Sequence, residues 1–292
     1  MEYTSLNKYL KQRFGCKVYK LSLSSGLSCP NRDGAISRGG CIFCSEGGSG
    51  DFAACSVLSI TEQIEQAKEK VSSKISSGKY IAYFQAFTNT YGPIEYLRTI
   101  FYEAISHPDI VAISIGTRPD CLGDDVIALL DELNKIKPVW IELGLQTIHE
   151  STAQYINRGY TLDVFDDAVT RLNSIDVDVI VHVILGLPGE SKSDMLETVA
   201  YVCNKNIQGI KLQLLHVLKN TPLAELYSKG CFEVLNMNEY IELVGDCLKI
   251  IPSDIVIHRL TGDGPKSLLI APLWSQDKKK VLNAMNRHIS SL

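Results

Sequence analysis

The sequence predicts an α/β fold, an open TIM-type barrel of six β/α units, and three observations support this prediction. Six short runs rich in Val, Ile, Leu and Tyr show little polar alternation, as is typical of parallel strands covered on both faces. Helix-length segments lie between these runs. Distinctive polar, Gly or Pro residues follow each run, at the edge where such folds build their sites. Because six units are fewer than the eight of a closed barrel, we expect a partial (β/α)6 barrel.

The strands are expected in order along the chain. They cover residues 17–24, 80–86, 110–115, 139–145, 178–185 and 209–214. A seventh run, residues 255–260, is a further candidate strand that comes late in the chain. The loops that follow the six strands therefore meet at one edge of the sheet.

The first helix between strands has the clearest start signal. Ser59 and Glu62 form a capping-box pattern, in which each side chain accepts a hydrogen bond from the backbone N–H of the other residue. The apolar stripe that follows consists of Ile64, Ala67, Val71 and Ile75. The other helices are expected at residues 94–107, 124–136, 162–175, 191–204 and 238–251.

The chain of 292 residues is long enough for one such barrel. We expect a basic helical extension at residues 1–16, the barrel core with a cysteine loop (25–50) at residues 17–260, and a C-terminal helical extension at residues 261–292. The first residues lack the apolar core of a signal peptide, and the most apolar later stretch, 177–188, is too short to span a bilayer. Nine scattered cysteines fit a reducing compartment. We therefore expect a cytoplasmic protein with no membrane attachment.

Charge is unevenly distributed in a chain whose net charge is −4. Residues 1–40 hold seven basic and two acidic side chains, a surplus of +5 that leaves −9 for the rest. A second basic group closes the chain and consists of Lys278, Lys279, Lys280 and Arg287. If the two ends meet, they could bind phosphate groups; the alternative is two ordinary solvated helix faces.

Three cysteines in one Gly-rich segment, CPNRDGAISRGGCIFC, give the main indication of chemistry. Cys29 precedes the close pair Cys41 and Cys44, and Phe43 lies directly before the last of them. Four thiolates saturate a structural zinc ion or an iron–sulfur cluster, whereas three can hold a cluster and leave one iron open. A zinc site with Cys55 as its fourth ligand is the alternative. The polar loops after the later strands favour the open cluster, since a zinc site on an unrelated barrel would not require them.

Five segments in a fixed order extend this indication over roughly residues 15–260. They are CPNRDG…GGCIFC, ISIGTRPDCL, ELGLQT…NRGYT, HVILGLPGES and LLHVLKNTPL. Together they resemble the radical S-adenosylmethionine (SAM) proteins, in the group that includes the elongator catalytic subunit, the oxygen-independent coproporphyrinogen oxidases and the methylthiotransferases. Within that group the chain is most similar to a YhcC-like family. Its gap of eleven residues between the first two cysteines is longer than the usual three, as in a subset of the superfamily.

The resemblance implies a radical SAM enzyme, either an oxidoreductase or a transferase. Cys29, Cys41 and Cys44 would ligate three irons of one [4Fe–4S] cluster, and SAM would chelate the fourth. Reductive cleavage of SAM would give a 5′-deoxyadenosyl radical that abstracts hydrogen from a substrate. The implied partner is a one-electron reductase of the flavodoxin or ferredoxin type.

The resemblance also implies residues that hold SAM. Gln146 and Arg158 match a Gln/Arg pair that contacts SAM, and the forked donors of a guanidinium suit a carboxylate; the alternative for Arg158 is a surface residue at a helix end. Segment 85–90 stands where the family has a glycine-rich motif that binds the methionine part. The contacts expected from it are Gln85, Thr88 and Asn89.

A departure from the family occurs after the third strand. Relatives place a Glu there for the ribose hydroxyls, whereas this chain has Gly116. The residues that follow, Thr117, Arg118 and Asp120, are candidate SAM contacts. Asp120 or Glu142 could replace the missing ribose ligand.

Three later residues complete the implied SAM site. His182 stands where relatives have an Asp near the ribose, or else is a satisfied core histidine. Gly186 begins a turn that resembles the one beside the adenine, or else a generic strand-to-helix turn. Leu215, after the sixth strand, is also a candidate contact.

Cys121 follows a strand directly and is the candidate catalytic residue, as a hydrogen donor or thiyl site. Its alternative is a small buried apolar residue.

The substrate is not specified by these residues. The resemblance to the elongator subunit and the basic termini suggest tRNA or another RNA, while a small molecule or a protein remains open. Two alternative functions involve no radical chemistry. One is an iron–sulfur electron carrier or sensor, and the other is a zinc-stabilised binding module.

Overall fold

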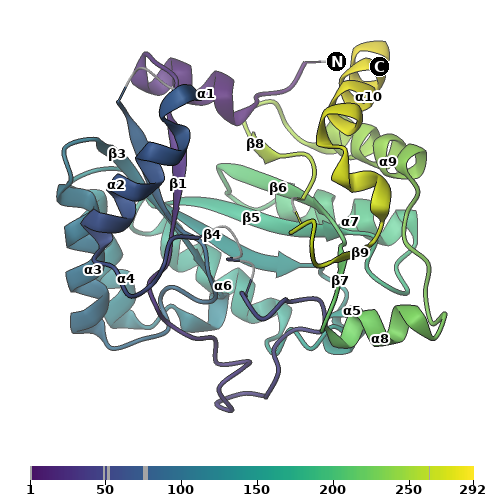
Figure 1. The fold of residues 1–292 in the computed structure, drawn as a ribbon, viewed down its shortest axis with the longest axis horizontal. Helices are drawn as coiled ribbons and strands as arrows, with labels where there is room; N and C mark the ends of the chain where they lie inside the picture. The colour runs from purple at the N-terminus through teal and green to yellow at the C-terminus, as the bar shows by residue number, and fades with distance from the viewer. Residues whose placement is uncertain (1, 49, 51–52, 75–77, 263) are drawn as a thin grey trace.

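A curved sheet of seven parallel strands forms the centre of the molecule (Figure 1). The structure is a computed structural model that describes residues 2–48, 50, 53–74, 78–262 and 264–292. In sheet order the strands are β1 (Tyr19–Leu23), β2 (Tyr80–Phe84), β3 (Ile110–Thr117), β4 (Val139–Gln146), β5 (Asp178–Leu185), β6 (Gly209–Leu214) and β8 (Val256–Arg259). The predicted α/β partial-barrel class is confirmed. The count of six strands was too low, because the late candidate at residues 255–260 pairs with β6 in parallel and extends the sheet.

The expected helices cover the outer face of this sheet (Figure 1). They are α2 (Ile60–Val71), α3 (Ile94–Ser106), α4 (Asp124–Asn134), α6 (Leu162–Asn173), α7 (Lys192–Cys203) and α9 (Met237–Ile250). The predicted capping box of Ser59 and Glu62 begins α2, and Ile64 and Ala67 of its stripe are buried. Ile75, the last residue of that predicted stripe, lies outside the described residues.

Several short elements were not predicted. They are the helices α5 (Glu150–Tyr155) and α8 (Pro222–Ser228), the antiparallel pair β7 (Val217–Leu218) and β9 (Leu269–Ala271), and the 3-10 turns η1 (Ser72–Lys74), η2 (Pro119–Cys121) and η3 (Leu273–Gln276). They lie in connections that carry no strong periodicity of their own. An apolar cluster joins α5, α8, β7 and β9 beside the barrel.

The inside of the barrel is layered. An apolar floor consists of Val18, Ile81, Ala112, Trp140 and Ile180, with Leu10 packed among them. Side chains on one face of a strand recur every second residue. The next inward positions on the strands are all polar, and we call them the polar level: Lys20, Tyr83, Ser114, Glu142, His182 and Lys211. The sheet therefore places a charged layer directly above an apolar one.

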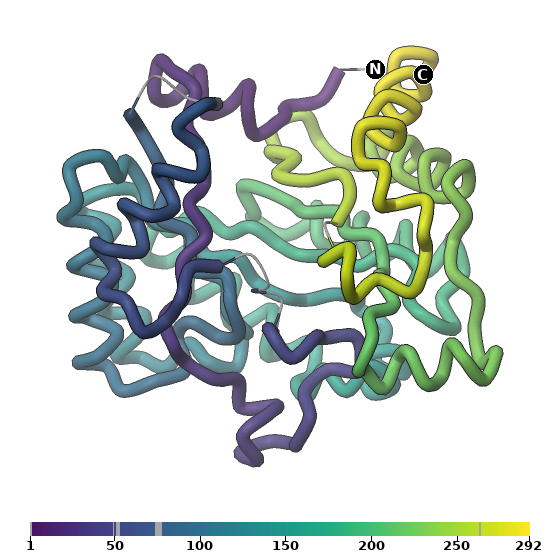
Figure 2. Tube along the Cα trace, in the orientation of Figure 1, coloured from purple at the N-terminus to yellow at the C-terminus, as the bar shows by residue number. Residues whose placement is uncertain are grey.

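The two chain ends meet beneath that floor. Helix α1 (Leu6–Phe14) buries Leu10, and the N–H of Ile257 in β8 donates to the carbonyl of Thr4 at 2.8 Å. Glu2 and Ser5 share a surface depression with Asn286 of α10 (Lys278–Ser291). Figure 2 shows both ends on the side of the molecule opposite to residues 25–48. No helix among the described residues is long and apolar enough to cross a membrane.

Candidate active site

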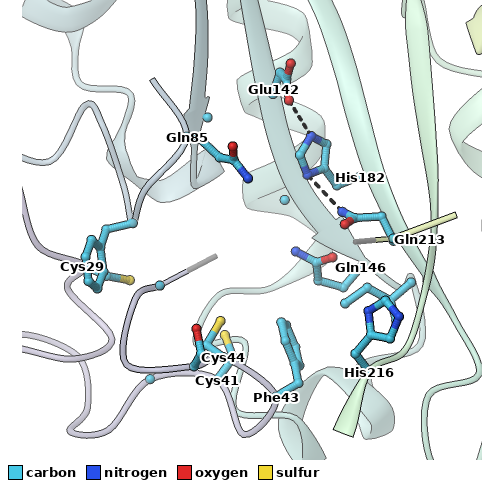
Figure 3. Close-up of a pocket in the computed structure, with 18 of the residues that line it drawn as sticks. Cys29, Cys41, Phe43, Cys44, Gln85, Glu142, Gln146, His182, Gln213 and His216 are labelled. Carbon is cyan, nitrogen blue, oxygen red and sulfur yellow. Dashed lines mark hydrogen bonds and ion pairs between the residues drawn. The ribbon is translucent and has the colours of Figure 1, made fainter. Parts of the chain in front are cut away.

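A cavity of about 230 Å3 lies between the cysteine loop and the polar level (Figure 3). Three cysteines stand at one end of this view and Glu142 at the other. The structure brings together twelve of the predicted site residues in its lining: Cys29, Cys41, Cys44, Gln85, Thr88, Thr117, Arg118, Glu142, Gln146, Arg158, His182 and Leu215. The remaining four, Asn89, Asp120, Cys121 and Gly186, are not among the described residues that line it.

The Cys41–Cys44 turn is anchored by the residue that follows its first cysteine. The N–H of Ile42 donates to the carbonyl of Ile156 at 3.1 Å, and the carbonyl of Ile42 accepts from the N–H of Leu223 at 3.0 Å. The side chains of Ile42 and Phe43 pack on the apolar cluster of α5, α8, β7 and β9. The two residues between the cysteines thus fix the loop to segments far away in the sequence.

Two asparagines clamp the same loop from the other side. The buried amide of Asn31 donates to the carbonyl of Asn157 and lies 3.6 Å from Sγ of Cys41. The amide of Asn157 in turn donates to the carbonyl of Gly40 at 2.8 Å and to the hydroxyl of Ser37 at 3.0 Å. These bonds hold both ends of the eleven-residue segment between Cys29 and Cys41 against Asn157.

The environment favours the thiolate form of Cys41. The Cys44 thiol donates to it and lowers the pKa of Cys41 to about 7, and Arg118, the Asn31 amide and Arg32 act in the same direction. A thiolate is the form that binds a metal. The loop therefore presents a ligand that is partly ionised at neutral pH.

The sulfur positions do not suit a single zinc ion. Tetrahedral zinc with Zn–S bonds of about 2.3 Å would bring its sulfurs to within about 4 Å of one another. Within the described part of the chain, Cys29, Cys41 and Cys44 do not form a group whose ligand atoms all lie within 4.8 Å of one another. Cys55, the predicted fourth ligand of that alternative, is exposed. Cys41 and Cys44 form a hydrogen-bonded pair and Cys29 stands apart from it (Figure 3), so the three thiols do not surround one small ion.

Gln146 presents a buried acceptor to the cavity. Its Oε1 atom has no hydrogen-bond partner among the described residues, and its backbone has φ +71°, which is costly for a non-glycine residue. Its lining neighbours Gly144 and Gly116 lack side chains; a Cβ on Gly144 would lie 2.8 Å from Nε2 of Gln146. A buried acceptor beside space kept free by glycines fits a bound ligand that carries N–H or O–H donors, as SAM does.

Arg158 is buried, and its guanidinium donates hydrogen bonds to groups of the protein. Its Nε and Nη2 donate to the carbonyl of Tyr160 at 3.0 and 2.9 Å. Nη1 donates to the carbonyls of Leu145 at 3.3 Å and Thr147 at 2.6 Å, and Nη2 to Glu150 at 3.0 Å. These bonds use all five N–H groups of the guanidinium. The alternative of a surface residue is wrong, because Arg158 is only 1% exposed, and the predicted fork to the SAM carboxylate has no donor left to make it.

Arg118 and Asp120 form a bidentate pair beside the cysteines. Nε and Nη2 of Arg118 donate to the two carboxylate oxygens of Asp120 at 2.9 and 2.7 Å, and Nη1 donates to the carbonyl of Arg158 at 2.8 Å. The Tyr160 ring lies against both guanidiniums, with Cζ of Arg118 at 5.0 Å and Cζ of Arg158 at 4.6 Å from its centre. Asp120 thereby orients Arg118, which lines the cavity, and does not itself reach the cavity.

Glu142 is saturated and is not an open ribose ligand. One of its carboxylate oxygens accepts from Lys20 and, at 2.7 Å, from Ser114. The other accepts from Lys211 and, at 2.8 Å, from Nε2 of His182. Burial alone would raise the pKa of Glu142, but Lys20 and Lys211 hold it well below its usual range. The carboxylate is therefore the fixed counter-ion of the polar level.

His182 is a neutral member of the same network. Its Nε2 donates to Glu142, and its Nδ1 accepts from the amide of Gln213 at 3.2 Å. Burial, together with Lys211, lowers the pKa of His182 to about 4. These two bonds match the alternative interpretation of His182 as a core histidine whose hydrogen bonds are satisfied. His182 also lines the cavity.

The other predicted residues mainly shape the loops. Asn89 is buried and donates to the carbonyls of Phe84 and Gly116. Cys121 lies in η2 with Sγ 3.8 Å from Asp120, and burial raises its pKa to about 12, so it stays a protonated thiol at neutral pH and is not among the described residues that line the cavity. Gly186 has φ +93° and forms the turn after β5.

Sequence reasoning missed the deep end of the cavity. Tyr83, Lys211, Gln213 and Arg259 line the cavity there, and His216 lines it nearer to Phe43 and the cysteines (Figure 3). A signal was present in the run GIKLQL, where a Lys and a Gln occupy alternate positions of an otherwise apolar strand. On a barrel strand, such positions point to the inside.

Known proteins share this chain's sequence and fold. Residues 31–202 match the Radical SAM superfamily, and residues 207–291 match the Radical_SAM C-terminal domain. The chain is 47% identical to the uncharacterized protein YtqA of Bacillus subtilis over 99% of this chain and 90% of that protein. It is 36% identical to protein YhcC of Escherichia coli over 96% of this chain and 90% of that protein.

A solved structure shares this fold. The archaeal Methanocaldococcus infernus Elp3 with an N-terminal deletion superposes with a TM-score of 0.65 at 19% identity, covering 90% of this chain and 63% of that one. At this identity the likeness concerns the fold alone. The superfamily match over more than half of the chain and the two long relatives together show that this chain belongs to the radical SAM superfamily and is a radical SAM enzyme, with a [4Fe–4S] cluster and SAM as its cofactors.

Proposed function

We propose that Cys29, Cys41 and Cys44 hold the cluster and that SAM lies in the adjoining cavity, with its substrate in the barrel interior. When bound, the cluster and SAM supply one-electron reductive cleavage to a 5′-deoxyadenosyl radical that abstracts hydrogen. The observation that carries the proposal is the buried, unpartnered Oε1 of Gln146 on the wall that also holds the three cysteines. This oxygen can accept a hydrogen bond from an N–H or O–H group of SAM bound next to the cysteines.

The roles of the surrounding residues follow from their contacts. Gln146 accepts a hydrogen bond from SAM, while Gly116 and Gly144 leave room for it. Arg118, oriented by Asp120, has N–H groups beyond those in its three protein bonds and offers them to a carboxylate of the ligand. Arg158 and Asn157 hold the loops between which SAM binds.

Anaerobic reconstitution tests the cluster assignment. We expect about four irons per chain, the content of one [4Fe–4S] cluster, and a SAM-dependent change in the electron paramagnetic resonance spectrum of the reduced protein, with 5′-deoxyadenosine as product. Cys29→Ser, Cys41→Ser and Cys44→Ser should each lose the cluster. Cys55→Ser is the matched control and should keep it. Loss of iron from the control, or a tight zinc site in the wild type, would overturn the assignment.

Gln146→Leu tests the SAM position independently of turnover. It should keep its iron and lose the SAM-dependent spectral change, because the acceptor is gone. The control Gln154→Leu lies on exposed surface of α5. An unchanged response to SAM in Gln146→Leu would remove Gln146 from the site.

Electrons must reach the cluster from another protein. A one-electron reductase of the flavodoxin or ferredoxin type is the expected partner, and the nine scattered cysteines of the chain favour a cytoplasmic location. A reduced flavodoxin should support 5′-deoxyadenosine formation in place of dithionite. If no flavodoxin or ferredoxin does so while dithionite does, the partner is of another kind.

A second candidate concerns an RNA substrate. The chain is 26% identical to the tRNA uridine(34) acetyltransferase of Methanocaldococcus jannaschii over 55% of this chain and 30% of that protein. The two chain ends meet at a depression lined by Glu2, Tyr3, Ser5, Asn286, Ile289 and Ser290, on the side opposite the cysteine loop, so RNA bound there would lie away from the cavity (Figure 2). Filter binding of bulk tRNA at low and moderate salt, with Lys278, Lys279 and Lys280 changed to Ala, tests this candidate. Binding that does not weaken with salt or with these changes would exclude the basic ends as an RNA site.

A further inference from the structure

Arg32 joins the two ends of the cysteine motif. Its backbone N–H donates to the carbonyl of Cys29 at 2.8 Å. Nη2 of its guanidinium donates to the carbonyl of Cys44 at 3.1 Å and to that of Ser45, and Nη1 donates to the carbonyl of Glu46 at 3.4 Å. Arg32 also lines the cavity together with the three cysteines. The guanidinium is therefore held among the residues that we propose as cluster ligands.

Close packing keeps the guanidinium in this place. Gly40 directly precedes Cys41, and a Cβ at Gly40 would lie only 2.8 Å from Nε of Arg32. The centre of the Phe87 ring lies 5.5 Å from Cζ of Arg32, within the range of a cation–π contact. Phe87 belongs to the segment after β2 and lines the same cavity. The positive charge of Arg32 is thus fixed between the cysteine loop and the loop after the second strand.

Arg32 differs from the other two arginines at this end of the cavity in its partners. Arg118 forms an ion pair with Asp120, and Arg158 forms one with Glu150. The guanidinium of Arg32 instead donates to backbone carbonyls, and no carboxylate among the described residues forms an ion pair with it. Carbonyl groups hold a guanidinium but do not cancel its charge. Arg32 therefore presents a full positive charge at the site of the proposed cluster.

We propose that Arg32 is a positioning residue for the electron: its charge stabilises the reduced cluster and raises the potential at which the cluster is reduced. This inference rests on the proposed function, since it needs the cluster on the three cysteines. A [4Fe–4S]2+ core with three thiolates has one net negative charge, and reduction by one electron doubles it. A fixed positive charge stabilises the reduced state more, because coulombic energy grows with the product of the charges. Local charge is one of the factors that set the potential of such clusters.

The expected benefit is easier electron transfer from the reductase. A flavodoxin or ferredoxin supplies the electron, and the cluster accepts it without breaking a bond. At a given potential of this donor, a larger fraction of the clusters is reduced when the guanidinium is present. The three carbonyl bonds alone would give no such effect, because they order the loop equally in both oxidation states.

A redox titration of the reconstituted protein without SAM tests the proposal, with the electron paramagnetic resonance signal of the reduced cluster as readout. Arg32→Gln removes the charge. We expect about a tenfold lower ratio of reduced to oxidised cluster at a fixed potential, which is a midpoint about 59 mV more negative for a one-electron couple. Arg32→Lys keeps the charge but loses the planar fork, so its midpoint should stay close to that of the wild type. An unchanged midpoint in Arg32→Gln, or an equally lowered one in Arg32→Lys, would overturn the proposal.

Arg38 supplies the matched control on the same loop. It is exposed, and its backbone forms an isolated bridge with that of Asp33. Arg38→Gln removes the same charge from the loop as Arg32→Gln, but at a position where water and salt screen it. Its midpoint should equal that of the wild type. A shift as large as that of Arg32→Gln would reveal a general effect of net charge and would contradict a specific role of Arg32.

A second measurement applies if Arg32→Gln holds its cluster too weakly for a titration. Arg32→Gln and Arg32→Lys both lose the forked bonds to the carbonyls, whereas only Arg32→Gln loses the charge. Iron release to a chelator that is faster from Arg32→Gln than from Arg32→Lys would support the role of the charge. Equally fast release from both variants would mean that Arg32 only holds the loop, and would overturn the proposal.

The wild type separates this inference from the proposed function. A wild type that carries the cluster and responds to SAM, but has the same midpoint as Arg32→Gln, contradicts only the role of Arg32. A wild type that takes up no iron–sulfur cluster contradicts the proposed function itself.

Discussion

Nε2 of His182 lies 2.8 Å from the carboxylate of Glu142, and this bond fixes the histidine as a neutral donor. The opposite ring nitrogen accepts from Gln213 at 3.2 Å. The pair links β4 with β5 inside the barrel and continues to β6 through Gln213. It also makes the stability of the protein depend on pH.

His182 should destabilise the folded protein in mild acid. Its pKa is lowered to about 4 in the folded protein, whereas the unfolded chain protonates near the ordinary value of 6.5. Between these values the unfolded state binds more protons, so stability is lost as pH falls. We expect this histidine to contribute about 2 kcal/mol to the loss between pH 7 and pH 5. Urea unfolding of the wild type and of His182→Gln measures it, and parallel pH profiles for the two would contradict the prediction.

Glu142→Gln should destabilise the protein strongly. It leaves Lys20 and Lys211 buried without their shared carboxylate, and removing one partner of a buried ion pair costs about 3–5 kcal/mol. Glu132→Gln is the control, since it breaks a solvent-exposed pair with Arg98 and should change stability little. Urea unfolding at neutral pH compares the two. Similar losses in both variants would show that the buried carboxylate has no special role.

Arg158→Lys should not be tolerated as a conservative change. An ammonium cannot reproduce five donors in a planar fork, so the carbonyls of Leu145, Thr147 and Tyr160 would lose partners. The expected loss of stability is about 3 kcal/mol. Arg171→Lys, at a more exposed pair with Asp124, is the control. A wild-type unfolding midpoint for Arg158→Lys would refute the structural role.

Cys121 should resist alkylation. With its pKa raised to about 12, its thiolate fraction at pH 8 is on the order of one in ten thousand. The exposed Cys55 and Cys231 provide internal controls. Brief treatment of the native protein with iodoacetamide, followed by mass spectrometry, should show label on these two before Cys121. Early labelling of Cys121 would return it to the list of reactive candidates.

Asn31→Ala should weaken retention of the cluster. The buried amide holds the loop through Asn157 and lies beside Cys41, and loss of such a supporting contact typically lowers metal affinity about tenfold or more. Iron release to a chelator measures the effect, with Asn286→Ala on exposed surface of α10 as control. Equal release rates from the two variants would mean that the clamp does not support the site.

Much of the fold was readable because most of the strands are apolar runs followed by distinctive residues. The seventh strand was harder to assign, because β8 has four residues and ends in His258 and Arg259. The short elements α5, α8, β7 and β9 lack a period of their own and form through contacts with one another and with Ile42 and Phe43. Such elements depend on tertiary packing, which local pattern does not report.

The candidate site was likewise predictable only in part. The cysteines and Gln146 could be found because they follow strand ends in a motif. The partners of Arg158 and Glu142 could not, because a motif identifies a residue but not which of its donors and acceptors the fold already uses. Lys20 and Lys211 lie far apart in sequence and meet only through the curvature of the sheet.

The anchoring of Ile42 has a consequence for the life of the protein in the cell. The cysteine loop is synthesised early, but its backbone partners Ile156 and Leu223 emerge from the ribosome much later. A nascent chain therefore exposes its thiols before the surface that orders them exists. Delivery of the cluster to a finished loop must follow synthesis of most of the sheet, so the timing of maturation is set by the order of the chain.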